Sequence, residues 1–177
     1  MHTTSMRTLF AIIAAGLLAA CQTHRAADVA APMTSIELQQ PRDGLYTAGQ
    51  PAAGDWQAIA ARGVATVVNL RPQAEMAGRD EAAEVALAGM RYAEIPVSGA
   101  AGITMENARA LRTLLQQASG PVLVHCASGN RVGALIALGA ADAGAGADDA
   151  IAQGRAAGMT GAEAKVRELL GASARTD

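Results

Sequence analysis

Two short segments, rich in apolar and β-branched residues, constrain what this chain can fold into. They are VATVVNL at residues 64–70, bounded by Gly63 and Pro72, and VLVH at 122–125, which follows Gly120 and Pro121. Neither segment alternates between apolar and polar residues, as a strand with one wet face would. Strands of this kind are buried on both faces, which requires helices on both sides of a mostly parallel sheet. The two segments therefore predict an α/β fold.

The rest of the chain alternates between strands and helices around these two segments. Further strands are predicted at residues 45–48 and 92–97. Helices are predicted from the 3.6-residue spacing of apolar positions and from turn residues at their ends; they span residues 55–62, 79–88 and 104–118, with another from about 131 and two short ones after it. The pattern predicts one α/β domain over residues 36–172, with 173–177 as a tail.

Composition excludes several classes of function. The chain has 177 residues, with 14 basic and 16 acidic side chains and no basic cluster, so nucleic-acid binding is not expected. Two cysteines are too few for a disulfide-stapled fold. Only His24 and His125 lie beyond the first 20 residues, and no metal site or cofactor is predicted from them.

The amino terminus has the layout of a targeting segment. Residues 1–20 contain Arg7, then an apolar stretch, then small residues, as in a secretory signal peptide. The residues Leu18 to Cys21 resemble a bacterial lipobox, in which the cysteine is acylated. With Gln22 next, the resemblance implies a periplasmic protein held by lipid at the outer membrane, with no other membrane contact. Residues 21–35 are then a flexible tether; ordinary signal cleavage and an uncleaved anchor are the alternatives.

The chemistry of the chain is concentrated in the loop that follows strand 122–125. Cys126 lies at the carboxyl end of this buried strand, where open α/β sheets bind ligands. Amides of a loop that enters a helix form an anion cradle, in which a cysteine is expected to react as the thiolate. Gly129 allows a tight turn, and the planar guanidinium of Arg131 matches two oxygens of an oxyanion. The amides of this cradle belong to Ala127, Ser128, Gly129 and Asn130.

This loop resembles the phosphate-binding loop of cysteine-dependent phosphatases. Four blocks, in order, extend the resemblance to the bacterial phosphatase-like domain that also occurs fused to β-lactamase-like hydrolases; they are residues 49–51, 68–71 with Glu75, 95–97 and 121–126. The resemblance implies that Cys126 is a nucleophile forming a phosphocysteine and that Arg131 binds the oxyanion. It also implies that His125 orients the loop.

Three features depart from the dual-specificity phosphatases. Four residues instead of five separate Cys126 from Arg131, and Val132 replaces the hydroxyl residue that commonly follows the arginine. The loop at 98–102, where those enzymes carry an aspartic acid as general acid, has no carboxylate. Glu106 is the nearest candidate for the acid, and Glu75 and Asp80 are others.

The pair Arg71 and Glu75, four residues apart, is expected either to form a salt bridge or to add Arg71 to the pocket. The main hypothesis is hydrolysis of phosphate monoesters on a small molecule or a protein. A Cys-x4-Arg loop without an evident acid is also typical of rhodanese-like sulfurtransferases, whose cysteine carries a persulfide and whose substrates contain sulfur. A third alternative is a module that binds oxyanions with little or no turnover.

Overall fold

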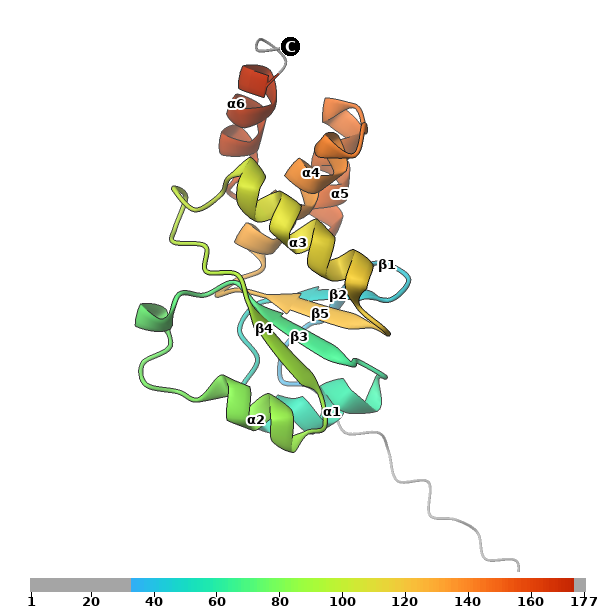
Figure 1. Cartoon of the computed structure of the whole chain (residues 1–177), viewed down its shortest axis with the longest axis vertical. Coiled ribbons are helices and arrows are strands. Elements are labelled where there is room, and N and C mark those ends of the chain that lie inside the picture. The colour runs from blue at the N-terminus through green and yellow to red at the C-terminus, as the bar shows by residue number, and fades with distance from the viewer. Residues whose placement is uncertain (1–32, 174–177) are drawn as a thin grey trace, which may run out of the picture. The chain divides into compact units, whose positions relative to one another are not determined.

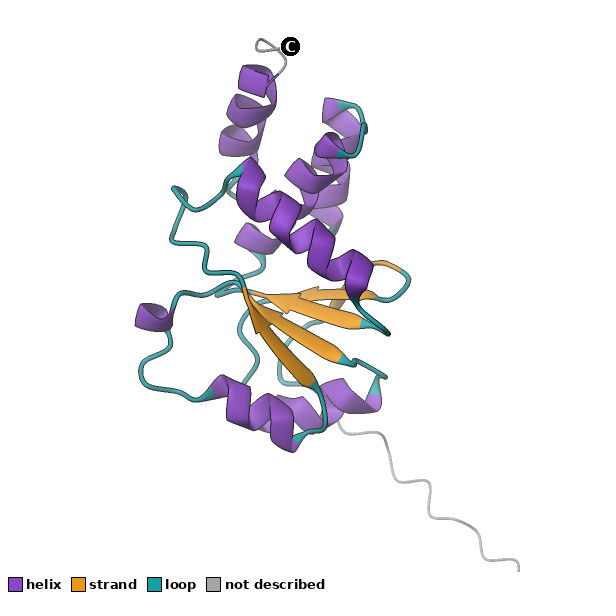
Figure 2. Cartoon of the chain, viewed as in Figure 1, coloured by secondary structure: helices purple, strands orange, loops and turns teal. Residues whose placement is uncertain are grey.

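A five-stranded sheet, ordered β1-β2-β5-β3-β4, forms the centre of the fold (Figures 1 and 2). The structure is a computed structural model, and it describes residues 33–173. The strands are β1 (Gln39–Arg42), β2 (Leu45–Ala48), β3 (Thr66–Asn69), β4 (Arg91–Glu94) and β5 (Val122–His125). Only β1 and β2 pair antiparallel; the other neighbours are parallel. The central strand β5 is flanked by β2 and β3, so its carboxyl end is enclosed on both sides.

Helices cover both faces of the sheet (Figure 1). They are α1 (Trp56–Ala61), α2 (Glu81–Leu87), α3 (Met105–Gln117), α4 (Asn130–Asp142), α5 (Ala147–Ala156) and α6 (Glu163–Ser173), with short 3-10 turns at Ala53–Asp55 and Gln73–Glu75. The last four helices lie on one face, and α1 and α2 lie on the other. The prediction of a mostly parallel sheet with helices on both faces is confirmed.

Alternate residues of the inner strands serve two separate cores. Val68 and Val124 pack with the helices α3 to α6, and Val67 and Leu123 pack with α1 and α2. All four side chains are completely buried. This explains why the inner strand segments do not alternate between apolar and polar residues.

The observed elements differ from the predicted ones in two places. Strand β1 was not predicted, because its sequence QQPR is polar and contains a proline. Strand β4 is shorter than the predicted 92–97, although the amides of Ile95 and Val97 still donate to the carbonyls of Asn69 and Leu70.

The ends of the predicted domain can be compared with the described residues only in part. The predicted signal segment, Cys21 and most of the tether lie outside them. Ser35, the last predicted tether residue, donates to both carboxylate oxygens of Asp55, at 2.6 and 2.8 Å. Among residues 33–173, no helix has the length and apolar character needed to cross a bilayer.

Candidate active site

The loop between β5 and α4 turns tightly around the sulfur of Cys126. Gly129 adopts a left-handed conformation, with φ of 86°, which favours glycine over any residue with a side chain. Its amide donates to Cys126 Sγ at 3.2 Å. On the outer side, the amide of Gln50 donates to the carbonyl of Ala127 at 3.2 Å, which ties the loop to the end of β2. The first amides of α4 have no partner within the helix, so the loop has the polarity of an anion cradle.

Three of the five N–H groups of the Arg131 guanidinium are bound to protein acceptors. Nη1 and Nη2 donate to Oε1 and Oε2 of Glu75 at 2.9 and 2.7 Å, and Nη1 also donates to the carbonyl of Val97 at 2.6 Å. The remaining two, Nε–H and the second Nη2–H, form one edge of the guanidinium plane. Hydrogen bonding to Glu75 raises the pKa of Arg131 against the effect of burial, and the adjacent Cys126 side chain raises it as well, by its charge and by a hydrogen bond. Arg131 is thus held by Glu75 and Val97 and interacts with Cys126.

Glu75 is held by two arginines and is ionised. Hydrogen bonding from Arg131, opposed by burial and assisted by Arg71, lowers the pKa of the Glu75 carboxyl group. Arg71 Nε lies 3.4 Å from Glu75 Oε2, and Arg71 Nη2 donates to the backbone carbonyl of Glu75. The predicted salt bridge between Arg71 and Glu75 is therefore present. Arg71 acts on Arg131 through Glu75.

His125, the residue before Cys126, is completely buried and forms a pair with Glu81. Nε2 of His125 lies 2.8 Å from Oε1 of Glu81, and both side chains are about fully enclosed, at 0% and 1% exposure. Burial alone would raise the pKa of the Glu81 carboxyl group. The hydrogen bonds from His125 and Gln50, together with the charges of His125 and Arg79, outweigh burial, so the pKa lies below its ordinary value. His125 is thereby fixed by Glu81, the first residue of α2, on the face of the sheet that α1 and α2 cover.

Asn130 connects the loop to the last helix. Its side-chain Oδ1 accepts hydrogen bonds from three successive backbone amides, of Thr160, Gly161 and Ala162, at 2.8 to 3.1 Å. These amides immediately precede α6, where backbone N–H groups have no acceptor within the helix. One side chain therefore holds the start of α6 beside the loop.

A cavity of about 340 Å³ lies between the loop and α6. Ala127, Ser128 and Arg131 line it from the loop, and Lys165 lines it from α6. Among the described residues that line it, Glu75 is the one carboxylate. Cys126 itself is 1% exposed and is not among the residues that line the cavity.

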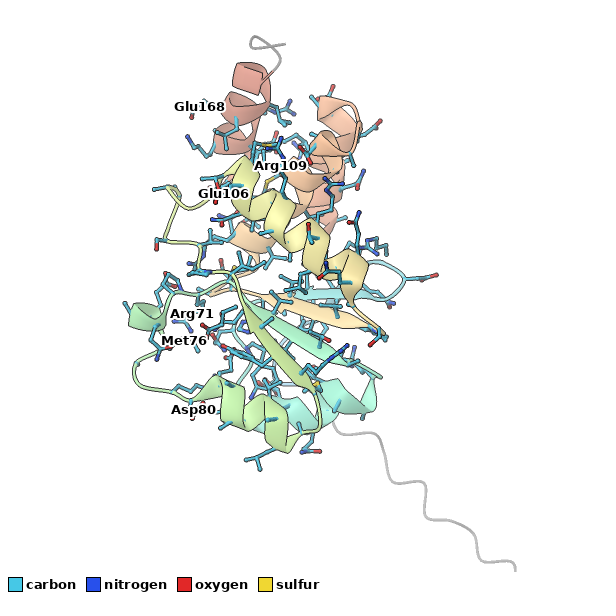
Figure 3. The ribbon with its side chains drawn as sticks, in the orientation of Figure 1. Arg71, Met76, Asp80, Glu106, Arg109 and Glu168 are labelled. Carbon is cyan, nitrogen blue, oxygen red and sulfur yellow. The ribbon has the colours of Figure 1, made fainter. Side chains whose placement is uncertain are left out.

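The candidate acids lie in different places. Glu106 is exposed near the start of α3, well away from Arg71, as Figure 3 shows, and it does not line the cavity. Asp80 is exposed, and its side chain accepts the Ala83 amide at 3.0 Å as the N-cap of α2. Glu75 is in the cavity, but it is ionised. The structure brings Cys126, the loop amides, Arg131, Arg71 and His125 together at one edge of the sheet, and it leaves Glu106 outside.

Sequence reasoning did not find the roles of Gln50 and Glu81. Gln50 belongs to the first block of the family resemblance, but nothing in its local sequence shows which side chains it contacts. Glu81 was included in a predicted amphipathic helix. The signal that could have found it is its place four residues before Val85, on the apolar face of that helix.

Comparisons with known proteins agree with this geometry. The model of the family described as "Beta-lactamase hydrolase-like protein, phosphatase-like domain" matches residues 38–145, which include β1 to α4. A beta-lactamase hydrolase-like protein of Agrobacterium fabrum is 39% identical over 101 residues, which are 55% of this chain and 23% of that protein. One from Xylella fastidiosa is 36% identical over 107 residues, 58% of this chain and 25% of that protein. The matched part thus spans about a quarter of the length of these curated relatives.

Solved structures with the same fold are phosphatases by name. A candidate phosphatase from Neisseria meningitidis superposes with a TM-score of 0.64 and 25% identity, covering 74% of this chain and 96% of that one. The kinase associated phosphatase, crystallised with serine in place of its catalytic-site cysteine, superposes with a TM-score of 0.59. Its identity is 14%, over 81% of this chain and 97% of that one, so it shows the fold alone.

Proposed function

The chain belongs to the family of phosphatase-like domains of beta-lactamase hydrolase-like proteins, and on that premise we propose that it hydrolyses phosphate monoesters through a phosphocysteine on Cys126. The fold and the family support a cysteine-phosphatase-like hydrolase. One observation carries the finer proposal. Glu75 and Val97 occupy three N–H groups of Arg131, and the two that remain form a planar pair on a guanidinium that interacts with Cys126.

In the proposed reaction, the Cys126 sulfur attacks phosphorus, and an S–P bond forms as the ester P–O bond breaks. Two non-bridging oxygens rest on Nε–H and Nη2–H of Arg131, and loop amides bind the developing charge. Water then attacks the phosphocysteine, so that phosphate is released and the thiolate returns. The leaving oxygen departs as its anion or takes a proton from water, because Glu75 is ionised and donates none.

This arrangement favours esters with stable leaving anions, and an aryl phosphate is the appropriate first substrate. The parent protein is expected to release inorganic phosphate from it, and Cys126→Ser is expected to abolish release without unfolding the protein. Equal turnover by the parent and Cys126→Ser would eliminate the phosphocysteine. In that case any phosphate release comes from another site.

Glu75, the one carboxylate among the described residues that line the cavity, is ionised, and this lack of a protonated carboxyl group favours a second candidate function, sulfur transfer. The Cys126 thiolate would attack the outer sulfur of thiosulfate, forming a persulfide as sulfite leaves without needing a proton. Cyanide would then take the sulfur as thiocyanate and regenerate the thiolate. Thiocyanate formation without aryl phosphate turnover would select this candidate.

A protein that binds phosphate or sulfate but turns over neither substrate would be an oxyanion-binding module. Amide signals of residues 127–131 that shift on phosphate titration, with no product from either assay, would identify it. The natural substrate, whether a phosphorylated or a sulfur-containing molecule, is then the target of a separate search.

We also propose that the protein is a lipoprotein of the periplasm, anchored at the outer membrane through Cys21. The proposal is supported by the apolar segment and the lipobox-like residues 18–21, which lie outside the described residues. Cys21→Ser is expected to move the protein from the membrane fraction to the soluble fraction, or to leave it unprocessed. A variant that fractionates and migrates as the parent does would contradict acylation.

A further inference from the structure

Gln50 lies at the centre of a chain of hydrogen bonds that passes behind the anion loop. Its Nε2 donates to Oε2 of Glu81 at 2.5 Å, and its Oε1 accepts from Nη1 of Arg71 at 2.6 Å. Glu81 continues the chain to His125, and Arg71 continues it to Glu75. The chain therefore joins the residue before the nucleophile to the carboxylate that holds the oxyanion-binding arginine.

The chemistry of the two neighbours requires an amide between them. Glu81 is an ionised, buried carboxylate that needs a donor, whereas the guanidinium of Arg71 needs an acceptor. A glutamine side chain supplies both from one planar group. A carboxylate in its place would face Glu81 as a like charge, and a hydrocarbon would remove one hydrogen-bond partner from each neighbour.

The far end of the chain sets the direction of the Arg131 guanidinium. Arg71 contacts Glu75 at both its carboxylate and its backbone carbonyl, which fixes the carboxylate opposite Arg131. Glu75 then takes Nη1 and Nη2 of Arg131 together. A shift of Arg71 would let Glu75 and the guanidinium rotate together, which would turn the Nε–H and Nη2–H pair away from the substrate oxygens.

The backbone of Gln50 acts on the other side of the same loop. Its amide donates to the carbonyl of Ala127, directly after Cys126, and Gly49 bridges to Ser128. The main chain of Gln50 therefore contacts the amide cradle, and its side chain reaches Arg131 through Arg71 and Glu75. These are the two parts of the site that must bind the same oxyanion.

We propose that Gln50 is a positioning residue for oxyanion binding, which orients Arg131 through Arg71 and Glu75 and never touches the substrate. The proposal rests on the proposed function, since it requires the loop to bind an oxyanion. It adds to the Cys-x4-Arg loop a residue that supports oxyanion binding from 76 positions before Cys126 in the chain.

The test compares Gln50→Met with Gln73→Met. Gln73 is exposed on the same stretch of chain as Glu75, and its side chain has no place in the hydrogen-bond chain. Inorganic phosphate is titrated into the ¹⁵N-labelled protein, while the amides of 127–131 and the Nε–H signal of Arg131 are followed. Gln50→Met is expected to raise the phosphate Kd about tenfold, the scale lost when a supporting hydrogen bond behind a binding group is removed. It is also expected to broaden the Arg131 Nε–H signal, and Gln73→Met should leave both unchanged.

A double-mutant cycle separates positioning from a general structural effect. If Gln50 acts through Glu75, adding Gln50→Met to Glu75→Gln should cost much less affinity than Gln50→Met costs in the parent. Additive losses would overturn the proposal, because they would mean that the two residues act independently. Should Gln50→Met fail to fold, Arg71→Met removes the link between Gln50 and Glu75 and is expected to raise the phosphate Kd by a similar factor; an unchanged Kd would overturn the proposal.

The two levels of the proposal fail in different ways. If the parent protein does not bind phosphate, the proposed function fails, and the role of Gln50 fails with it. If the parent binds phosphate and Gln50→Met binds it as tightly as Gln73→Met does, only the role of Gln50 is overturned.

Discussion

Replacement of Arg131 by lysine tests the part of the site that the structure defines most fully. Arg131 makes three hydrogen bonds to Glu75 and Val97 while retaining two coplanar donors. A lysine ammonium has three donors on one atom and no plane, so it cannot hold Glu75 and also bind two substrate oxygens. Turnover of an aryl phosphate should fall by about 100-fold or more, the scale lost with one oxyanion donor. A factor of 100 corresponds to about 2.7 kcal/mol of transition-state stabilisation.

The fold should survive this substitution. The positive charge remains opposite Glu75, which also keeps its contacts with Arg71, so we expect a loss of only about 1 kcal/mol in the free energy of unfolding. Arg109→Lys is the matched control, because Arg109 is 61% exposed and pairs with Asp142, the last residue of α4, whose first residue belongs to the loop. If Arg131→Lys were folded and hydrolysed the substrate as fast as Arg109→Lys, Arg131 would not be the oxyanion binder.

Three further predictions concern stability. Asn130→Ala removes the acceptor of three backbone amides before α6 and should lower the free energy of unfolding by about 1–2 kcal/mol in urea, whereas Asn130→Asp keeps an acceptor; equal stability of all three proteins would contradict this. A Cβ at Gly133 would lie 2.3 Å from the backbone nitrogen of Met159, so Gly133→Ala should lower the free energy of unfolding by about 3 kcal/mol. Gly139→Ala should cost far less, because its Cβ would lie 3.7 Å from the nearest atom; equal losses of the two variants in thermal unfolding would refute the close packing. The carboxyl pKa values of Glu75 and Glu81 lie below their ordinary 4.5, so the native state binds fewer protons than the unfolded state, and stability should fall as pH falls through about 4.5; a free energy of unfolding that stays level between about pH 6 and 3 would contradict it.

The central part of the fold could be predicted from the sequence, because it depends on local pattern. The strands β3 and β5 are buried at each position because both faces of the sheet are covered, and the resulting lack of apolar–polar alternation is visible in a single sequence. Strand β1 is different: it is an edge strand whose contribution is backbone pairing with β2, and its polar side chains carry no periodic signal.

The candidate site divides in the same way. The loop from Cys126 to Arg131 is continuous in the chain, so its residue types and spacing indicated an oxyanion site directly. The partners of Arg131 could not be predicted from the sequence. Glu75 lies 56 residues away, in the 3-10 turn after β3, and it meets Arg131 because β3 pairs with β5. The role expected for Glu106 depended on its position in the chain after the loop at 98–102, whereas helix α3 carries it to an exposed surface outside the cavity.

The same reasoning explains why Gln50 and Glu81 were not recognised as a unit. A glutamine in a turn and a glutamate at a helix start are ordinary surface residues by composition. Their role depends on one side-chain hydrogen bond that joins them across 31 positions of sequence, and such a contact follows only from the folded sheet.

The central claim, that Cys126 is a nucleophile in an oxyanion-binding loop, is tested most directly by trapping the covalent intermediate. The protein is mixed with an aryl phosphate, quenched in acid within one turnover and digested, and the peptide that contains Cys126 is weighed by mass spectrometry. We predict a phosphoryl group on Cys126 in the parent and none on the corresponding peptide of Cys126→Ser. A parent peptide that stays unmodified while phosphate is released, or that accepts only sulfur from thiosulfate, would contradict the phosphocysteine.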